Sequence, residues 1–576
     1  MVSGTTSILL KRNEISYEPS GRRDLSAAAA ANPPLAPVNN RSLAPLLRVP
    51  PFPGARVGAF AERSEGYAEP SALAAALRSA RVGGTYWGAQ PDIPRGCILV
   101  RGIVARLRKD DLPQGPVVIW GAEPQPVSSA GATRLIHGEC DPWHLLSHAA
   151  AYVGDVDDEV HIIAALLGVP NYAVDRDCGT IFSIDVDPEA VISNRLGGRS
   201  FENPFTGQPM DALALVELCG FWRELIDSNR GIDGGLGFAF WKQSHVAPLL
   251  WSGASQFRFL RSAEGIENNS SVAVWQARVA KASIVELCAK NVRLVEVEDG
   301  FLRSRGLGAD CVPPMSITVD RLGAHFDPSR RSGLEDLLQN GRFDEVTIDR
   351  ARELRRTIVE AAIGKYDRGA VVLERRAAGR RHILVPGQVE DDRAVIAGGC
   401  GLVANLDLLR RVREQAPDAY ILYKPHPDVL AGHRRGEIAD RACLELADEI
   451  VRELPIASLI DMVDEVHVNT SLAGFEALLR GREVTTYGVP FYAGWGLTKD
   501  LGPVPVRRTS KRTLDELVAA TLLIYPRYFD PVTGLPCPAE VAVARLSARE
   551  EPDTNLLVGM RRLQGKFMRR LRSLVQ

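Results

Sequence analysis

Acidic and basic side chains come directly after an apolar run that ends near residue 297. The run Val-Arg-Leu-Val-Glu-Val at 292–297 is predicted to form a β-strand, and Glu298, Asp299 and Arg303 follow it. In an open α/β sheet, ligands bind beyond the carboxyl ends of the strands, so these side chains are placed to meet a substrate. A solvated Asp-Gly turn in which Arg303 neutralises Glu298 explains the same residues. Alone, the motif favours that plainer explanation.

Three more loops of this kind follow at domain-scale intervals. In each, polar side chains come directly after a predicted strand. The loops are Gln388 to Asp392 after the run at 383–387, Lys424 to Asp428 after 419–423, and Asn469 to Glu476 after 464–468. Because the carboxyl ends of parallel strands meet at one edge of a sheet, this repetition favours a binding or catalytic site.

The consecutive acids Glu390, Asp391 and Asp392 suit nucleophilic or acid/base chemistry. Like charges raise one another's pKa, unless a cation or alternating direction separates them, and strand alternation would turn Asp391 away from the other two. One carboxylate can then attack a sugar carbon while Glu298 or Asp299 handles protons, the two-carboxylate scheme of retaining glycosyl chemistry. A Mg²⁺ or Ca²⁺ site is the alternative, which ranks lower because no spaced D-x-D-x-D pattern is present.

Two of the loops suit an anion. Prolines on both sides of His426 fix its backbone, so the imidazole can donate to a phosphate while Lys424 adds positive charge. Thr470 and Ser471 begin a predicted helix, whose unpaired N–H groups and dipole attract a phosphate or carboxylate. Glu476, further along this helix, can accept hydrogen bonds from ribose hydroxyls. A plain helix cap with a solvated Glu476 is the alternative.

Length and composition limit the class of protein. With 576 residues the chain is too long for one core and is expected to form three or four domains. The formal net charge of -2 argues against nucleic acid as a partner. Nine cysteines occur without a C-x-x-C pair, which predicts reduced thiols in a cytoplasmic protein. No apolar run reaches the roughly 18 residues of a spanning helix, and the N-terminal apolar segment is too short for a signal peptide.

We predict an α/β protein made of six parts. They are a disordered leader at 1–55, an α/β region at 56–200, a helical connector at 201–270, α/β domains at 271–379 and 380–545, and a basic tail at 546–576. The tail has apolar residues at helical spacing, from Leu556 to Leu574, between six Lys and Arg residues. This pattern is typical of an amphipathic helix on an anionic membrane surface, and a docked helix with a solvated basic face explains it equally well.

The loops together resemble the capsule polysaccharide β-Kdo transferases of the KpsC type. The resemblance covers about 270 to 530 and rests on five motifs in consistent order. They are EDGFLRS at 298–304, QVEDD at 388–392, YKPHPD at 423–428, NTSLAGFEALLRG at 469–481 and YGVPFYAGWGLT at 487–498. The resemblance implies a GT-B-like pair of Rossmann-type domains beside the additional N-terminal α/β region and connector. It also implies retaining transfer from CMP-Kdo, without metal or cofactor, to build the glycolipid linker of capsular polysaccharide.

The resemblance also implies roles for single residues. Asp392 would receive Kdo, while Glu298 and Asp299 would activate and position the acceptor. The implied donor-binding residues are Gln388, Lys424, His426, Asn469, Thr470, Ser471 and Glu476, with His426 also counted as catalytic. Arg303, Ser304 and Glu390 would position the substrate.

The chain departs from the family upstream, because KpsC-type chains commonly carry two complete transferase modules and only one complete motif set is present here. The region at 56–200 is at best a degenerate transferase half. Segment 155–170 loosely repeats the pattern that starts at Glu476, which an internal duplication or any βαβ unit explains equally well.

The resemblance implies a cytoplasmic protein, peripheral at the inner membrane, with a lipid or glycolipid acceptor and capsule biosynthesis or export proteins as partners. Two alternatives remain open. The first is a GT-B transferase for another nucleotide sugar, because the sugar pocket leaves no readable motif. The second is a non-catalytic capsule assembly or export factor, for which a broken acidic loop would be expected.

Overall fold

The computed structural model describes residues 46–63, 66–102, 112–121, 132–175, 180–253, 255–302, 312–361, 375–377, 379–432 and 434–548. These residues form two compact units. The first contains the residues up to Pro51 together with Val57–Ser228, and the second contains Phe52–Arg56 and the residues from Asn229 onward. The predicted leader up to residue 45, the predicted basic tail from residue 549, and Arg303 and Ser304 lie outside the described residues.

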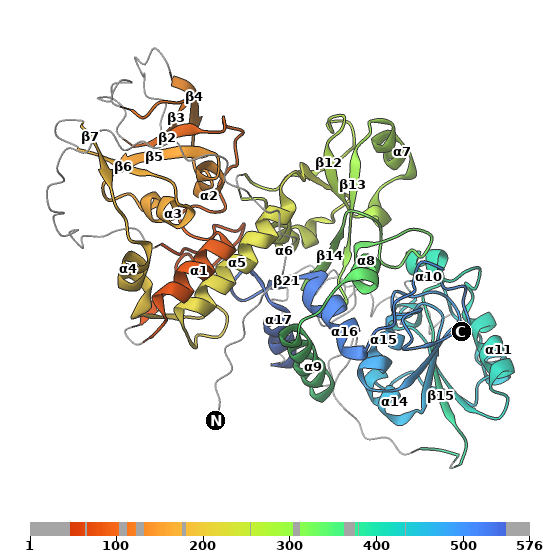
Figure 1. Ribbon diagram of the computed structural model, residues 1–576. Helices are drawn as coiled ribbons and strands as arrows, with labels where there is room; N and C mark the ends of the chain where they lie inside the picture. The colour runs from red at the N-terminus through yellow and green to blue at the C-terminus, as the bar shows by residue number, and fades with distance from the viewer. Residues whose placement is uncertain are drawn as a thin grey trace. The chain divides into compact units, whose positions relative to one another are not determined.

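The first unit is built on a six-stranded sheet in the order β4-β3-β2-β5-β6-β7 (Figure 1). Its strands are β2 (Cys97–Arg101), β3 (Val117–Gly121), β4 (Ala132–His137), β5 (Ala149–Asp155), β6 (Asn171–Val174) and β7 (Ile181–Ile184). All neighbours are parallel except β6 and β7. The chain moves outward from β2 and then returns to its other side with β5, which is the order of a doubly wound Rossmann sheet. The predicted N-terminal α/β region is confirmed.

Helices and a small second sheet complete the first unit. The helices are α1 (Pro70–Ala80), α2 (Pro142–Leu146), α3 (Val160–Leu167), α4 (Pro188–Ile192) and α5 (Ala212–Asn229), and the small sheet joins β1 (Glu62–Arg63), β8 (Ser200–Glu202) and β9 (Pro209–Met210). Leu46 and Leu47 are already buried. We predicted that the folded part starts at residue 56, but it starts earlier in the chain.

The second unit contains two sheets. The first has the order β11-β10-β12-β13-β14-β21-β22. Its strands are β10 (Gly234–Leu236), β11 (Phe259–Leu260), β12 (Ser271–Val274), β13 (Arg293–Asp299), β14 (Ser316–Asp320), β21 (Pro526–Asp530) and β22 (Leu535–Cys537). Strands β10 to β13 are parallel, whereas β14, β21 and β22 are antiparallel to their neighbours. Helices α6 (Phe240–Leu250), α7 (Lys281–Ala289), α8 (Gly333–Asn340) and α9 (Glu345–Glu360) belong to this part.

The second sheet is parallel throughout, in the order β17-β16-β15-β18-β19-β20. Its strands are β15 (His382–Pro386), β16 (Tyr420–Lys424), β17 (Glu449–Ile450), β18 (Glu465–Val468), β19 (Glu483–Thr486) and β20 (Lys499–Asp500). Its helices are α10 (Arg393–Gly398), α11 (Asn405–Gln415), α12 (Pro427–Leu430), α13 (Asp440–Leu444), α14 (Ile456–Met462) and α15 (Leu472–Leu479). The two sheets confirm the predicted GT-B-like pair of Rossmann-type domains.

Two of the predicted domain boundaries differ from the structure. The stretch 201–270, predicted as a helical connector, holds α5 and α6 but also β8 to β11. The segment after Thr513 leaves the second sheet, because α16 (Leu514–Val518) packs on α9 and β21 pairs with β14 (Figure 1). Helix α17 (Ala539–Ser547) also packs on α9 and β21. The first Rossmann-type domain therefore includes the end of the described chain.

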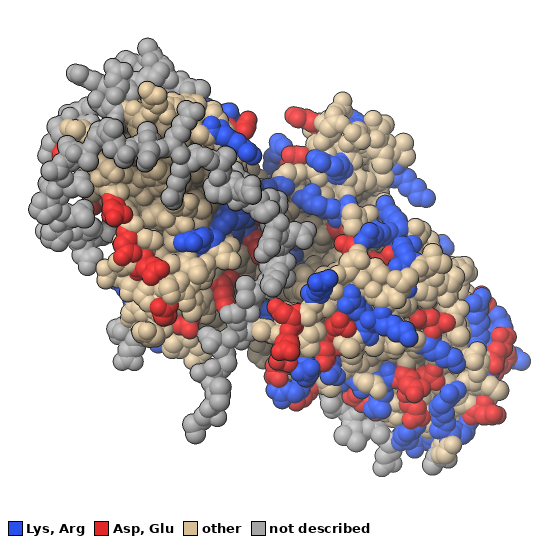
Figure 2. Space-filling model, viewed as in Figure 1, with Lys and Arg blue, Asp and Glu red and all other residues tan. Residues whose placement is uncertain are grey.

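Charged residues of both signs are mixed on the face of the molecule that Figure 2 shows. Figure 2 shows Lys and Arg interspersed with Asp and Glu over the region of α8, α10 and α11. Among the residues that the structure describes, no helix combines the length and the apolar character needed to cross a membrane.

Candidate active site

The predicted polar loops all lie at carboxyl ends of strands in the second unit. Strand β15 ends at Pro386, β16 at Lys424 and β18 at Val468. Strand β13 runs further than expected, to Asp299, because β14 pairs with it in antiparallel register and Glu298 lies opposite Thr318. The two acids are thus the last residues of a strand, where the ladder fixes their backbone, and are not on the predicted turn.

Glu298 contacts the facing sheet through Arg393, the first residue of α10. The Arg393 guanidinium donates hydrogen bonds to Oε1 of Glu298 and to the side chain of Gln276, and lies 3.6 Å from a carboxylate oxygen of Glu296. Burial raises the pKa of Glu298 to about 7; Arg393 opposes this shift, while Asp299 and Glu296 add to it. A carboxyl with this pKa exchanges protons readily near neutral pH.

Asp299 is held by Lys242, a residue of α6. The Nζ of Lys242 donates to Oδ1 of Asp299 at 2.9 Å and lies 3.6 Å from the ring centroid of Trp275. The ammonium is therefore bound by a carboxylate and by an aromatic face at once. Glu298 and Asp299, although adjacent, each have a cation of their own.

The three consecutive acids point to three different partners. Glu390 accepts the N–H that begins α11 at 2.8 Å, and Asp391 is exposed and accepts from Nε of Arg434 at 3.2 Å. Asp392 is half-buried and caps α10 by accepting the N–H two residues further on, at 3.0 Å. The predicted role of Glu390 toward substrate stays a prediction, and its carboxylate has a structural partner within the loop.

A clamp around Asn405 joins the loops after β15 and β18. Asn405 accepts the N–H of Gln388 at 2.8 Å and donates to the carbonyls of Gln388 and Gly436 at 2.8 and 2.9 Å. The side chain of Gln388 in turn accepts the N–H of Thr470 at 2.9 Å. The side chains of Asn405 and Gln388 are both buried. Their hydrogen bonds therefore fix the position of the loop after β15 relative to the loop after β18.

The loop after β18 continues into α15. Asn469 is buried and donates to the carbonyl of Leu402 at 2.6 Å, while its Oδ1 accepts no hydrogen bond from the described residues. A Cβ at Gly488 would collide with Asn469. Ser471 caps α15 by accepting a backbone N–H at 3.3 Å, and Glu476 lies half-buried on the same helix. This arrangement matches the predicted helix start.

His426 and Lys424 follow β16. The Nδ1 of His426 accepts the N–H of Asp428 at 3.1 Å and caps α12, which leaves Nε2 as the donor of the neutral ring. The Nζ of Lys424 is nearly buried and donates to the carbonyl of Arg452 at 3.3 Å. The predicted rigid presentation of the imidazole agrees with this cap.

An aromatic cluster joins the motif segments of both domains. Phe301, which follows the acids of β13, has its ring centroid 4.6 Å from that of Phe491 and 6.4 Å from that of Phe475 in α15. His325 lies 4.9 Å from Phe301. Three of the sequence motifs therefore meet around one buried aromatic contact.

The sequence reasoning missed Arg393, Lys242 and Asn405. Arg393 directly follows the acidic run, and the need for a cation among adjacent acids was a signal that pointed to it. Lys242 is separated by 57 residues from Asp299, and nothing in its local sequence indicates the contact. Asn405 begins a helix and looked like an ordinary helix start.

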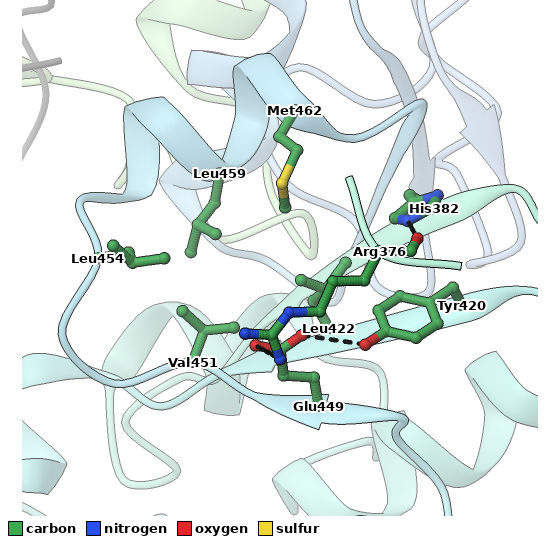
Figure 3. Close-up of a pocket in the computed structure, with 9 residues that line it drawn as sticks. All are labelled: Arg376, His382, Tyr420, Leu422, Glu449, Val451, Leu454, Leu459 and Met462. Atoms are coloured by element: carbon green, nitrogen blue, oxygen red, sulfur yellow. Dashed lines mark hydrogen bonds and ion pairs between the residues drawn. The ribbon is translucent and has the colours of Figure 1, made fainter. Parts of the chain in front are cut away.

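A cavity of about 80 Å³ lies at the other end of the second sheet (Figure 3). It is lined by His382 and Tyr420, the first residues of β15 and β16, and by the Arg376–Glu449 ion pair of 3.2 Å. Ligand pockets for drug-sized molecules usually measure about 300–1,000 Å³. This cavity is therefore too small for a nucleotide sugar and is separate from the loops at the carboxyl ends.

Comparisons with known proteins match the part of the chain that holds these loops. The family model described as "Capsule polysaccharide biosynthesis protein" matches residues 270–371 and 350–528. The capsule polysaccharide modification protein LipA of Neisseria meningitidis serogroup A is 37% identical over 359 residues, which are 61% of this chain and 51% of LipA. The lipopolysaccharide-processing protein LpsZ of Rhizobium meliloti is 44% identical over 261 residues, 45% of this chain and 59% of LpsZ. The chain thus spans only part of the length of these relatives.

Two solved structures of Thermosulfurimonas dismutans KpsC are also similar. The β-Kdo 2,7 transferase is 34% identical with a TM-score of 0.45, and the match covers 55% of this chain and 99% of that one. The β-Kdo 2,4 transferase is 30% identical with a TM-score of 0.48, covering 55% and 98%. The part of the chain from residue 270 to 528 matches the capsule polysaccharide biosynthesis protein family, and the identity to LipA and LpsZ agrees with the resemblance to the KpsC type that the sequence motifs indicate.

Proposed function

We propose that this protein is a retaining β-Kdo transferase that uses CMP-Kdo and a glycolipid acceptor in capsular polysaccharide synthesis. The match to the capsule polysaccharide biosynthesis protein family, the similarity to the two KpsC β-Kdo transferases and the intact acidic loop support the proposal. The single observation that carries it is the contact between Arg393 and Glu298, because it joins the neighbour of Asp392 to an acid of the facing domain.

The proposed reaction has two displacements. In the first, a carboxylate oxygen of Asp392 bonds to the anomeric carbon of Kdo, and the bond from that carbon to the phosphate oxygen of CMP breaks. CMP leaves with the electron pair. In the second, an acceptor hydroxyl attacks the same carbon and the bond to Asp392 breaks, while the hydroxyl proton passes to Glu298. Two inversions give overall retention.

The departing CMP needs its negative charge stabilised. The Nε2–H of His426, the ammonium of Lys424 and the N-terminus of α15 at Ser471 are the groups we assign to the phosphate. Asn469 and Thr470 would bind the donor beside them, and Glu476 the ribose. Gln388 shapes this site through the Thr470 N–H. No step of this scheme routes charge through a metal ion.

Intact-mass spectrometry tests the proposal. Wild-type protein incubated with CMP-Kdo and no acceptor should gain the mass of one Kdo unit, and Asp392→Asn should gain nothing. Asp391→Asn is the matched control, because Asp391 is adjacent in the chain but exposed and paired with Arg434. The control should form the adduct as the wild type does. An adduct that persists in Asp392→Asn, or that never forms in the wild type, would contradict the two-step scheme.

Thermal shift distinguishes CMP-Kdo from other donors. A bound donor raises the melting temperature, so CMP-Kdo should do so more strongly than other nucleotide sugars at equal concentration. A larger shift with a different nucleotide sugar would favour a GT-B transferase for that donor. No shift with any nucleotide sugar would favour the non-catalytic assembly or export factor.

A further inference from the structure

Arg393 is the first residue of α10 and directly follows Asp392. Its guanidinium is bound from the other Rossmann-type domain at three points. It donates to Glu298 on β13 and to Gln276 after β12, and it lies 3.6 Å from Glu296. The guanidinium carbon is also 5.0 Å from the ring centroid of Phe326. A single side chain beside the candidate nucleophile is therefore held by the acceptor-side sheet.

Asp392 is positioned by the same helix, because it caps the α10 N-terminus where Arg393 lies. Asp392 caps α10 through a bond to the second N–H of that helix, so its carboxylate is fixed relative to the helix that carries Arg393. The far end of α10 is anchored in its own domain, where Gly398 accepts the N–H of Val489 at 2.8 Å. Helix α10 is thus secured to one domain at its end and to the other domain at its start.

The charges around Glu298 make the contact more than a surface ion pair. Arg393 on α10 and Lys242 on α6 face Glu298 as cations, while Asp299 and Glu296 face it as acids from its own strand. The side chain of Glu298 is only 17% exposed, so the charge of Arg393 acts through a poorly screened medium. Removing Arg393 should leave Glu298 beside two acids with Lys242 as its remaining cation.

We propose that Arg393 is a positioning residue that links the two Rossmann-type domains at both proposed catalytic carboxylates, orienting Asp392 through α10 and pairing with Glu298 on β13. This inference rests on the proposed transferase function. The guanidinium binds the acids of β13 while Asp392 caps the helix that carries it, so the one side chain sets the position of Asp392 relative to Glu298.

Kinetics of Arg393→Gln, Arg393→Lys and Arg330→Gln test the inference. Arg330 is the matched control, because it donates to the same acidic cluster at Glu296, at 3.4 Å, but does not touch α10. We expect Arg393→Gln to lower kcat roughly 10- to 100-fold while KM for CMP-Kdo changes about 3-fold or less, since misplacement of reacting groups affects the chemical step. Arg393→Lys should recover part of kcat. Arg330→Gln should keep kcat within about 2-fold of the wild type.

The pH profile separates positioning from simple loss of stability. If Glu298 accepts the acceptor proton, kcat rises with pH through the pKa of Glu298, and Arg393→Gln should move this rise to higher pH. Arg330→Gln should leave it in place. A kcat within 2-fold of the wild type together with an unmoved pH profile in Arg393→Gln would overturn the inference.

Hydrogen exchange makes the test independent of turnover. Peptides covering 389–399 should exchange faster in Arg393→Gln than in wild type or Arg330→Gln, because α10 has lost its hold on the facing domain. Unchanged exchange would refute the coupling even if the enzyme used another donor. Faster exchange in a protein that never forms the Kdo adduct would retain the coupling and reject the transferase assignment, so the two failures are distinguishable.

Discussion

Replacing Glu298 by Gln tests the electrostatics of the acidic pair through protein stability. Burial raises the pKa of Glu298 from its usual 4.5 to about 7, with Asp299 and Glu296 adding to the shift against Arg393 and Lys242. A raised folded-state pKa means that the protonated carboxyl stabilises the fold. This stabilisation is complete below pH 4.5 and is lost as the pH rises through 7, because unfolding then releases the carboxyl to ionise in water. Gln is neutral at every pH and removes this dependence.

The size of the effect follows from the shift. Each pKa unit corresponds to about 1.4 kcal/mol, so a shift from 4.5 to about 7 costs the wild type about 3 kcal/mol once Glu298 is fully ionised. Most of this loss, about 2 to 3 kcal/mol, falls between pH 5 and pH 8. The free energy of unfolding of Glu298→Gln relative to the wild type should therefore rise by this amount over that range. Urea unfolding with pulsed hydrogen exchange on peptides covering β13 measures it.

Glu516→Gln is the control for this experiment. Burial would raise the pKa of Glu516, but hydrogen bonds from Thr513 and Arg512 outweigh burial and lower it. Its stabilisation is present above pH 4.5 and is lost only as the pH falls through the lowered pKa, so Glu516→Gln should differ from the wild type by a constant between pH 5 and pH 8. If Glu298→Gln also gave a constant difference, Glu298 would be an ordinary ionised carboxylate, and its assignment as the proton acceptor would lose its physical basis.

Three further predictions concern other parts of the chain. Asn405→Ala should lower the free energy of unfolding by about 2 to 4 kcal/mol and weaken CMP-Kdo binding in calorimetry, because three buried hydrogen bonds are lost. Gln339→Ala removes mainly solvent-exposed hydrogen bonds to Thr509 and should cost about 1 kcal/mol or less. Asp141→Asn should destabilise the first unit by about 3 to 5 kcal/mol in thermal melts, because it removes the charge that Arg223 binds at 2.6 Å in the core. Deletion of 556–576 should abolish flotation with anionic liposomes, and equal flotation would eliminate the membrane-helix prediction.

The sequence was sufficient for the α/β architecture because local pattern and tertiary environment agree. The strands predicted at 383–387, 419–423 and 464–468 became β15, β16 and β18 within one residue at their ends. The first two are mostly apolar, as buried parallel strands usually are, whereas the third carries Glu465 and His467. The return of the chain after residue 513 to the sheet that contains β14 was not foreseeable. The pairing of β21 with β14 joins Tyr528 to Ser316 across more than 200 residues, and no local signal specifies such a partner.

In the site as well, features set by a short segment of sequence could be predicted, and features set by distant strands could not. Ser471 was recognisable because helix capping is a local property of one loop, whereas the cap that Asp392 forms on α10 was not predicted. Glu298 and Asp299 were recognisable as acids at a strand end, but their placement on the strand itself depended on β14, whose pairing the sequence did not indicate. Arg303 and Ser304, predicted to position the substrate, lie outside the described residues and stay predictions.

The contact between Arg393 and Glu298 explains why one motif cannot be interpreted without the others. The acids at 298–299 and the acids at 390–392 each look like solvated loops when taken alone, because a surface carboxylate needs no special partner. Arg393, which directly follows the second group of acids, binds Glu298 of the first, and Glu298 reaches a pKa of about 7 because burial outweighs this cation. If the proposed chemistry takes place at this contact between the two domains, it should respond to any substitution that loosens α10 even when both carboxylates are intact.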